Sequence, residues 1–181
     1  MRMVALLRGI NVGGNRLIPM AELRRLAGKC GLSAIETLIQ SGNLVFEAGG
    51  LGAAEVEARL EAAIERRFGF SVAVIVRTRT QWRKYAAASP FAEAERTRPG
   101  RVLLGLSKSR PARGAVQALR GRATLGERIE VRGDAIWVDF AGGAGKSELK
   151  PARFDQAAGS PVTMRNWNTV RKLGEMLERE G

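Results

Sequence analysis

The order of short apolar segments and amphipathic helices along the chain limits the possible folds more than any other feature. Met3 to Leu7 is a continuous apolar run that is too short for a helix, so we expect a buried strand there. A glycine-rich segment and a helix starting at Pro19 follow, because Met20, Leu23 and Leu26 share one helical face. The remaining elements expected up to residue 76 are a strand at 35–39, a strand at 44–46, a helix at 54–68 and a strand at 71–76. This βαββαβ order predicts the ferredoxin-like split unit.

A second series of elements repeats the order after a connecting helix at 81–88. We expect a strand at 101–106, a helix at 111–119, a hairpin of strands at 128–131 and 136–140, a helix at 146–157, a weak strand at 160–164 and a terminal helix at 165–180. The predicted class is therefore α+β, with two ferredoxin-like βαββα(β) halves arising by internal duplication and an extra C-terminal helix. The corresponding boundaries are 1–77 for the first half, 78–100 for the connecting helix and linker, 101–164 for the second half and 165–181 for the terminal helix.

The chain has no histidine and a single cysteine, Cys30, among its 181 residues. This composition excludes histidine acid–base catalysis, Cys/His zinc sites and Cys–His nucleophile pairs, and it excludes a disulfide within the chain. We therefore expect no metal site and no cofactor. The first apolar run is stopped by Arg8 and is too short for a secretion signal, and no apolar stretch is long enough to cross a membrane. We accordingly expect a cytoplasmic protein without a membrane partner.

The net charge of +12 is concentrated in the middle of the chain. Residues 1–76 hold 9 basic and 7 acidic residues, whereas residues 77–132 hold 14 basic and 4 acidic residues. Such a local positive field favours anionic partners, nucleic acid or phosphorylated ligands, through counterion release and electrostatic steering. The candidate nucleic-acid-binding residues are Arg110, Arg113, Arg120 and Arg122. The alternative is a solvated arginine-rich surface that reflects genomic base composition, since the chain has 24 arginines and only 6 lysines.

Four segments, taken in order, resemble one protein family. They are LLRGINVGG (6–14), IPMAELRRL (18–26), IQSGNLVF (39–46) and TMRNWNTVRKL (163–173), and together they span nearly the whole chain. The resemblance is to the bacterial domain-of-unknown-function family 1697. It implies an α/β fold built of ferredoxin-like halves, but the family has no established biochemical activity to transfer.

Two of these segments form the first candidate ligand site. The first and second strands of a ferredoxin-like unit run parallel with the third between them, so the chain leaves both strands at the same end of the sheet. The loop from Arg8 to Gly14 and the turn from Gln40 to Asn43 must then meet. The candidate ligand-binding residues there are Arg8, Asn11, Gly13, Gly14, Gln40, Ser41 and Asn43. The alternative is a mutual hydrogen-bond network that only locks the two turns.

Two further segments could bind anions or bases. Gly145, Lys146 and Ser147 open the helix expected at 146–157 and could hold an anion at its N-terminus, although their spacing does not fit a nucleotide triphosphatase loop. In Arg165–Asn168, Thr163 and Asn166 suit the capping of the terminal helix, and Trp167 either anchors the core or stacks on a base beside Asn168. Arg165, Asn166, Trp167 and Asn168 are therefore candidate ligand-binding residues, as are Lys146 and Ser147.

These patterns favour a noncatalytic or regulatory binding module for an anionic partner, either nucleic acid or a phosphorylated small molecule. The alternative is an enzyme acting on a small phosphorylated or carboxylated substrate, with Arg8 and Lys146 orienting it and Ser41 or Ser147 in the site. No base partner for either serine is visible in the sequence, which disfavours covalent catalysis. A third alternative is a structural or oligomerising protein without a ligand.

Overall fold

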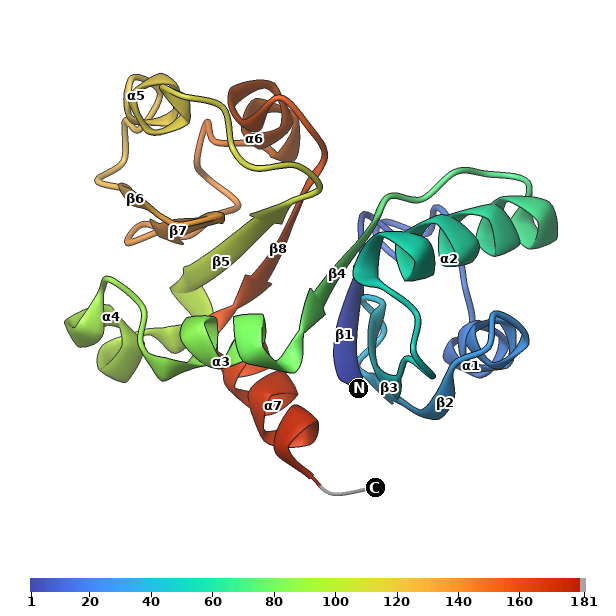
Figure 1. Cartoon of the computed structure of the whole chain (residues 1–181). Coiled ribbons are helices and arrows are strands. Elements are labelled where there is room, and N and C mark those ends of the chain that lie inside the picture. Colours follow the sequence, from blue (N-terminus) through green and yellow to red (C-terminus); the bar gives the residue numbers. More distant parts are fainter. Residues whose placement is uncertain (180–181) are drawn as a thin grey trace. The chain divides into compact units, whose positions relative to one another are not determined.

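The computed structural model describes residues 1–179, and these residues divide into two compact units (Figure 1). The first unit contains Met1–Arg83 together with the chain from Leu173, and the second contains Lys84–Lys172. Each unit carries its own four-stranded antiparallel sheet.

The first unit has the element order predicted from its apolar periodicity. Its elements are β1 (Arg2–Leu7), α1 (Met20–Lys29), β2 (Ser33–Leu38), β3 (Asn43–Glu47), α2 (Ala53–Phe68) and β4 (Val74–Thr78). The sheet order is β2-β3-β1-β4, and every neighbouring pair is antiparallel. Since β3 lies between β1 and β2, those two strands run parallel to each other, as expected for a ferredoxin-like unit.

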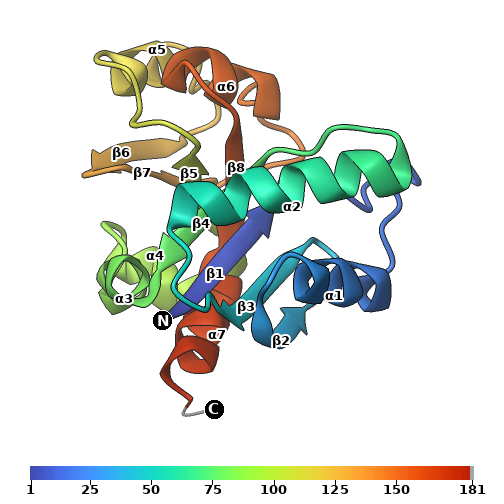
Figure 2. The same cartoon turned by 45° about the vertical axis from the view of Figure 1, so that its right-hand side comes forward.

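Helices α1 and α2 cover the same face of the first sheet (Figures 1 and 2). The strands contribute Met3, Ala5, Leu7, Leu44 and Phe46 to the core beneath the helices, which add Leu23 and Leu26 from α1 and Val56, Leu60 and Ile64 from α2. The spacing of four residues in α2 places its apolar side chains on one stripe, and burial of that stripe stabilises the helix. Gly69 ends α2 in the left-handed conformation, with φ of 76°.

The second unit repeats the topology of the first. Its elements are β5 (Val102–Ser107), α5 (Ala115–Arg120), β6 (Arg128–Arg132), β7 (Ala135–Asp139), α6 (Pro151–Ala158) and β8 (Val162–Asn166). The sheet order β6-β7-β5-β8 is that of the first sheet with every strand number raised by four. Helices α5 and α6 lie side by side over one face of this sheet (Figure 1) and bury Leu119 and Phe154 against Ile129, Ile136 and Val138.

The remaining elements connect or end the units. They are α3 (Arg79–Ala87), α4 (Ala92–Thr97), a 3₁₀ turn at Pro99–Arg101, and α7 (Trp167–Glu178). Helix α4 was not expected from the sequence. The terminal helix was expected to begin at Arg165, but that residue belongs to β8, and Glu180, its expected end, lies outside the described residues.

Two predicted helices of the second half begin later than expected, for separate reasons. Helix α5 starts at Ala115 and not at Pro111, because Gly114 immediately before it takes a left-handed conformation with φ of 86°. Helix α6 starts at Pro151 and not at Lys146. Lys150 is extended, with ψ of 159°, because a residue before proline is disfavoured in the helical conformation.

These corrections leave the predicted fold class intact. The protein is α+β, with two similar ferredoxin-like halves and a C-terminal helix. Within residues 1–179, no helix combines the length and apolar character needed to span a bilayer.

Candidate ligand-binding loops and basic surface

The β1–α1 loop (residues 8–19) and the β2–β3 turn (residues 39–42) meet at one end of the first sheet, as the topology predicts. The amide of Leu7 donates to the carbonyl of Gly42 at 2.8 Å, and the side-chain Nδ2 of Asn11 donates to the carbonyl of Gln40 at 2.7 Å. Ile10 is buried and lies close to Gly42, where a Cβ atom would come within 2.7 Å of the Ile10 Cδ1 atom. The predicted meeting of the loop and the turn is therefore confirmed.

Asn11 uses its whole side-chain amide to hold this arrangement. Besides the bond to Gln40, its Nδ2 donates to the carbonyl of Ile18 at 3.0 Å, and its Oδ1 accepts the amide of Ile18 at 2.8 Å. The backbone of Asn11 has φ of 54°, a left-handed conformation that asparagine tolerates better than most residues. Asn11 thus closes the β1–α1 loop on itself and ties it to the turn.

Asn43 and Ser41 are also engaged within the protein. The fully buried Asn43 donates from Nδ2 to the carbonyl of Leu38 at 2.9 Å and to the hydroxyl of Ser41 at 3.0 Å. A buried amide must satisfy its donors internally, and these two bonds do so across the hairpin turn. The polar groups of Asn11, Ser41 and Asn43 therefore support the mutual network that was the alternative to a ligand clamp.

The other candidates at this end of the sheet lie nearer the surface. Gly13, Gly14 and Gln40 are exposed and Arg8 is half-buried, so ligand binding by these residues stays a prediction. The sequence reasoning missed three aliphatic side chains beside them, Val12, Leu17 and Ile39, which are 66%, 61% and 57% exposed. Their apolar character was the available sequence signal.

Ser147 is buried and engaged, in a setting different from the one expected. Its hydroxyl donates to Glu127 Oε1 and accepts the amide of Leu149 at 3.1 Å, while Glu127 Oε2 accepts the amide of Leu125 at 2.8 Å. Burial acts to raise the pKa of Glu127, but the hydrogen bonds from Ser147 and Leu125 outweigh it and leave the pKa below its usual value. No helix begins at 145–147, so the helix N-terminus expected there is wrong, and anion binding by the exposed Gly145 and Lys146 stays a prediction.

The segment Arg165–Asn168 is divided between β8 and α7. Arg165 is buried in the strand and donates to the Thr163 hydroxyl and to the carbonyl of Met164, both at 2.8 Å, so Thr163 is not the predicted helix cap. Burial lowers the pKa of Arg165 to about 10. Asn166 does cap α7, because its Oδ1 accepts the amide of Thr169 at 3.0 Å.

Trp167 is an anchor of the second unit and not an open stacking platform. Its side chain is 5% exposed, and its ring centroid lies 5.8 Å from that of Trp137 at an interplanar angle of 60°. A tilted aromatic pair of this kind adds packing energy within a core. Asn168 beside it is exposed, and its proposed contact with a base stays a prediction.

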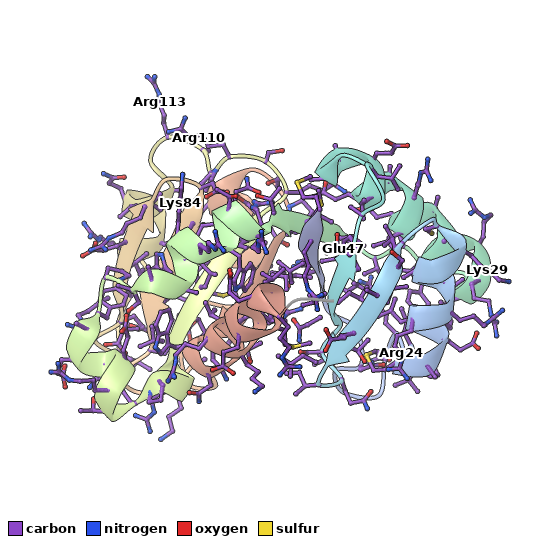
Figure 3. All side chains as sticks on the ribbon, turned by 60° about the horizontal axis from the view of Figure 1, so that its bottom comes forward. Arg24, Lys29, Glu47, Lys84, Arg110 and Arg113 are labelled. Carbon is purple, nitrogen blue, oxygen red and sulfur yellow. The ribbon has the colours of Figure 1, made fainter. Side chains whose placement is uncertain are left out.

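The four arginines predicted to bind nucleic acid fall into two groups. Arg110, Arg113 and Arg122 are exposed, and within residues 1–179 none of them pairs with a carboxylate. Arg120 has a structural role instead, since its Nε and Nη2 both donate to the carbonyl of Ile129, at 3.1 and 2.8 Å. Figure 3 shows Arg110 and Arg113 standing out from one loop with their side chains directed away from the ribbon.

Sequence reasoning also missed a charged cluster that holds the chain preceding β5. The carboxylate of Asp139, at the end of β7, is fully buried and accepts Nη2 of Arg98 at 2.9 Å and Nη2 of Arg128 at 2.7 Å. The guanidinium of Arg128 also lies 4.9 Å from the ring centroid of Phe91, a cation–π contact. An acidic residue at the end of the apolar run from Ala135 to Val138 was the available sequence signal.

Residues 1–179 contain no group of three His, Cys, Asp or Glu side chains that could hold a metal ion. Cys30 is half-buried, and its Sγ donates to the carbonyl of Arg59 at 3.6 Å. Burial raises the pKa of the Cys30 thiol even though Arg59 and Arg66 act to lower it. A thiol with a raised pKa is a weak nucleophile at neutral pH.

Comparison with known proteins agrees with the resemblance seen in the sequence. The model of the family described as proteins of unknown function, DUF1697, matches residues 1–137. The chain belongs to this family. The match covers three of the four resembling segments, whereas the fourth, at 163–173, lies beyond it.

A similar solved structure is that of a conserved bacterial protein, SP0830, from Streptococcus pneumoniae. It superposes on this DUF1697 chain with a TM-score of 0.70 at 24% sequence identity, covering 98% of each chain. At this identity the likeness establishes the common fold. No curated protein gives a significant match to the chain.

Proposed function

We propose that this DUF1697 protein is a noncatalytic binding protein for nucleic acid, and that the second unit carries the binding surface. The observation that supports this proposal is the charge balance of that unit. Lys84–Lys172 contains 17 basic and 8 acidic residues, a net charge of +9, whereas the rest of the chain contains 13 basic and 10 acidic residues. A surface of this sign attracts the phosphate backbone independently of base sequence.

The acidic residues of the second unit are largely engaged inside it. Asp139 is buried against Arg98 and Arg128, and Glu127 is buried against Ser147. Both carboxylate oxygens of Asp134 accept the hydroxyl of Tyr85, at 2.6 and 2.7 Å. These carboxylates therefore do little to neutralise the exposed cations.

Several exposed cations of this unit, by contrast, have no acidic partner in the described part of the chain. The side chains of Arg110, Arg113, Arg122 and Lys146 form neither an ion pair nor a hydrogen bond there. Cations without internal partners lose no ion pair when they bind phosphate, and each releases counterions from the nucleic acid. This favours phosphate binding over a purely structural role for the charge.

The salt dependence of oligonucleotide binding tests the proposal. We expect the affinity for a fluorescent oligonucleotide, measured by anisotropy, to fall as a power of salt concentration, with a slope of about 0.7 to 0.9 per phosphate contacted. In a triple variant, Arg110→Gln, Arg113→Gln and Arg122→Gln, both the affinity and the slope should decrease. Arg120 stays unchanged in this variant because it supports the contact between α5 and β6.

The matched control removes the same charge from the first unit. Arg16, Arg66 and Arg79 are exposed, and their replacement by Gln should leave the slope close to that of the wild-type protein. If both triple variants lost the same oligonucleotide affinity and the same salt slope, binding would depend only on net charge. That result would contradict a binding surface on the second unit. Absence of oligonucleotide binding at low salt would contradict the function itself.

A further inference from the structure

A pocket of about 390 Å³ lies at the end of the second sheet where β5 and β6 finish. It is enclosed by the loop between β5 and α5, the start of α5 and the β6–β7 hairpin. The lining residues are Arg110 to Gln117, Val131 and Gly133. We infer that this pocket binds a small phosphorylated ligand, with the phosphate held by Arg110 and Arg113.

The internal duplication explains why a pocket forms at this position. Strands β5 and β6 both pair antiparallel with β7 between them, so the loop after β5 and the hairpin turn after β6 leave the sheet at the same end. The equivalent position in the first unit is filled, because Asn11 bonds to Gln40 and Ile10 packs against Gly42. The second unit has a shorter loop, KSRPARG (108–114), and leaves this position open.

The charge of the pocket suits an anion. Arg110 and Arg113 line it and have no hydrogen-bond or ion-pair partner within the described residues, and no carboxylate contributes to the lining. Both side chains leave the same loop and extend into solvent (Figure 3), so they stand at the rim and can close over a bound group. Guanidinium groups bind phosphate oxygens bidentately, which makes a pair of arginines suited to a phosphomonoester.

The walls and the size of the pocket indicate what the phosphate is attached to. Pro111, Ala112, Ala115, Val116 and Val131 supply apolar surface, which suits the organic part of a metabolite or one nucleotide. The volume falls within the range of about 300 to 1,000 Å³ typical of small-molecule sites. This inference rests on the proposed function, because both use unpaired cations of the second unit, but it assigns a defined pocket and one phosphoryl group.

Isothermal titration calorimetry at low salt tests the inference with three probes. We expect adenosine 5′-monophosphate and inorganic phosphate to bind the wild-type protein, and adenosine, which has no phosphate, to bind at least about tenfold more weakly. The variant Arg110→Gln/Arg113→Gln should lose about tenfold or more in affinity for the monophosphate. The control Arg96→Gln/Arg153→Gln removes the same charge from exposed positions of the same unit outside this pocket, and it should keep the wild-type affinity.

A second pair of variants tests the pocket without removing an arginine. Ala112 is exposed and lines the pocket, so Ala112→Glu places a carboxylate beside the phosphate position and Ala112→Gln places a neutral side chain of similar size there. The glutamate variant should abolish binding of the monophosphate and the glutamine variant should largely retain it, with thermal unfolding used to confirm that both are folded. Equal affinities in these variants, or no binding of either phosphate probe to the wild-type protein, would overturn the inference.

Oligonucleotides with and without a 5′-phosphate distinguish a free metabolite from the end of a strand. If a 5′-phosphate strengthens oligonucleotide binding and Arg110→Gln/Arg113→Gln removes that gain in addition to its general effect on affinity, the pocket holds a strand end. If the 5′-phosphate has no effect while the monophosphate still binds, the ligand is a free small molecule. If the wild-type protein binds the monophosphate but no oligonucleotide, the proposed function is contradicted and the pocket is not. If it binds the oligonucleotide but neither phosphate probe, only the inference about the pocket is contradicted.

Discussion

Asn11 joins the two loops of the first unit, because its Nδ2 donates to the backbone carbonyl of Gln40 at 2.7 Å. The sequence marks both residues as candidate ligand-binding groups, whereas the bond between them is a contact that holds the loops together. Since this bond uses only the backbone of Gln40, the two side chains should differ sharply in their contribution to stability.

We predict that Asn11→Ala lowers the free energy of unfolding by about 3 kcal/mol, because it removes three hydrogen bonds and places alanine at a positive φ. Gln40→Ala should change it by less than about 0.5 kcal/mol, since this side chain is exposed. Urea denaturation followed by circular dichroism measures both values. A small effect of Asn11→Ala would show that the loops are held in another way.

Gly42 provides a second test of the same junction. A Cβ atom at this residue would lie 2.7 Å from the Ile10 Cδ1 atom and 2.8 Å from the Leu7 Cβ atom, and φ is 74°. We predict that Gly42→Ala costs about 3 kcal/mol or more, through overpacking and backbone strain together. At Gly14, φ is 76° but no atom lies within 4 Å of the Cβ position, so Gly14→Ala should cost only about 1 kcal/mol. Thermal or urea unfolding measures both variants. A similar decrease in the free energy of unfolding for Gly42→Ala and Gly14→Ala would refute the close packing of Ile10 on the turn.

The sequence predicts most of the fold because apolar periodicity is a local property of each element. Helix α2 and strand β1 were predicted to within one residue, as their buried positions repeat clearly. Helix α4 was missed because AEAERT has too short an apolar repeat, and only Ala94 of this helix is buried. The starts of α5 and α6 were wrong because Gly114 and Pro151 determine them more strongly than helix periodicity does.

The candidate site was predictable to a smaller extent. Strand topology requires the loop after β1 and the turn after β2 to meet, and they do. Residue type, however, shows only what a side chain can bind. Asn11, Ser41 and Asn43 are all capable of holding a ligand, but their partners are backbone or side-chain groups of neighbouring turns, which depend on the three-dimensional course of the chain. The partners of Ser147 and Arg120 could not be predicted from the sequence, because they too depend on the three-dimensional course of the chain.

Ile39 carries backbone strain that a substitution should relieve. It has φ of 51°, a conformation that is unfavourable for a β-branched residue, and its side chain is 57% exposed. We predict that Ile39→Asn raises the free energy of unfolding by about 1 kcal/mol. Val12 is similarly exposed but does not have a positive φ, so Val12→Asn should be neutral to within about 0.5 kcal/mol. Destabilisation by Ile39→Asn would indicate that the isoleucine makes contacts that outweigh the strain.

Asp139 should make the stability of the second unit depend on acid pH. Its burial acts to raise the pKa, but hydrogen bonds and charge from Arg98 and Arg128 outweigh that effect and hold the pKa of Asp139 below its usual value. A carboxyl whose pKa is lower in the folded protein stabilises the fold above the pKa of the unfolded chain, about 3.9, and loses that contribution as the pH falls through the lower folded value.

We therefore predict that Asp139→Asn lowers the free energy of unfolding by about 3 kcal/mol at neutral pH, because it removes the buried carboxylate that two arginines share. The difference in the free energy of unfolding between the variant and the wild-type protein should narrow below about pH 4, because the unfolded wild-type chain is protonated at Asp139 there and the folded protein only at lower pH. The control is Glu130→Gln, since Glu130 lies 3.7 Å from Arg132 in an exposed pair, and exposed pairs contribute about 0 to 1 kcal/mol. Urea denaturation of the three proteins between neutral pH and pH 3 measures these differences. If the free energies of unfolding of Asp139→Asn and the wild-type protein differ by a constant amount over that range, the packing of the Asp139 side chain, and not its charge, stabilises the cluster.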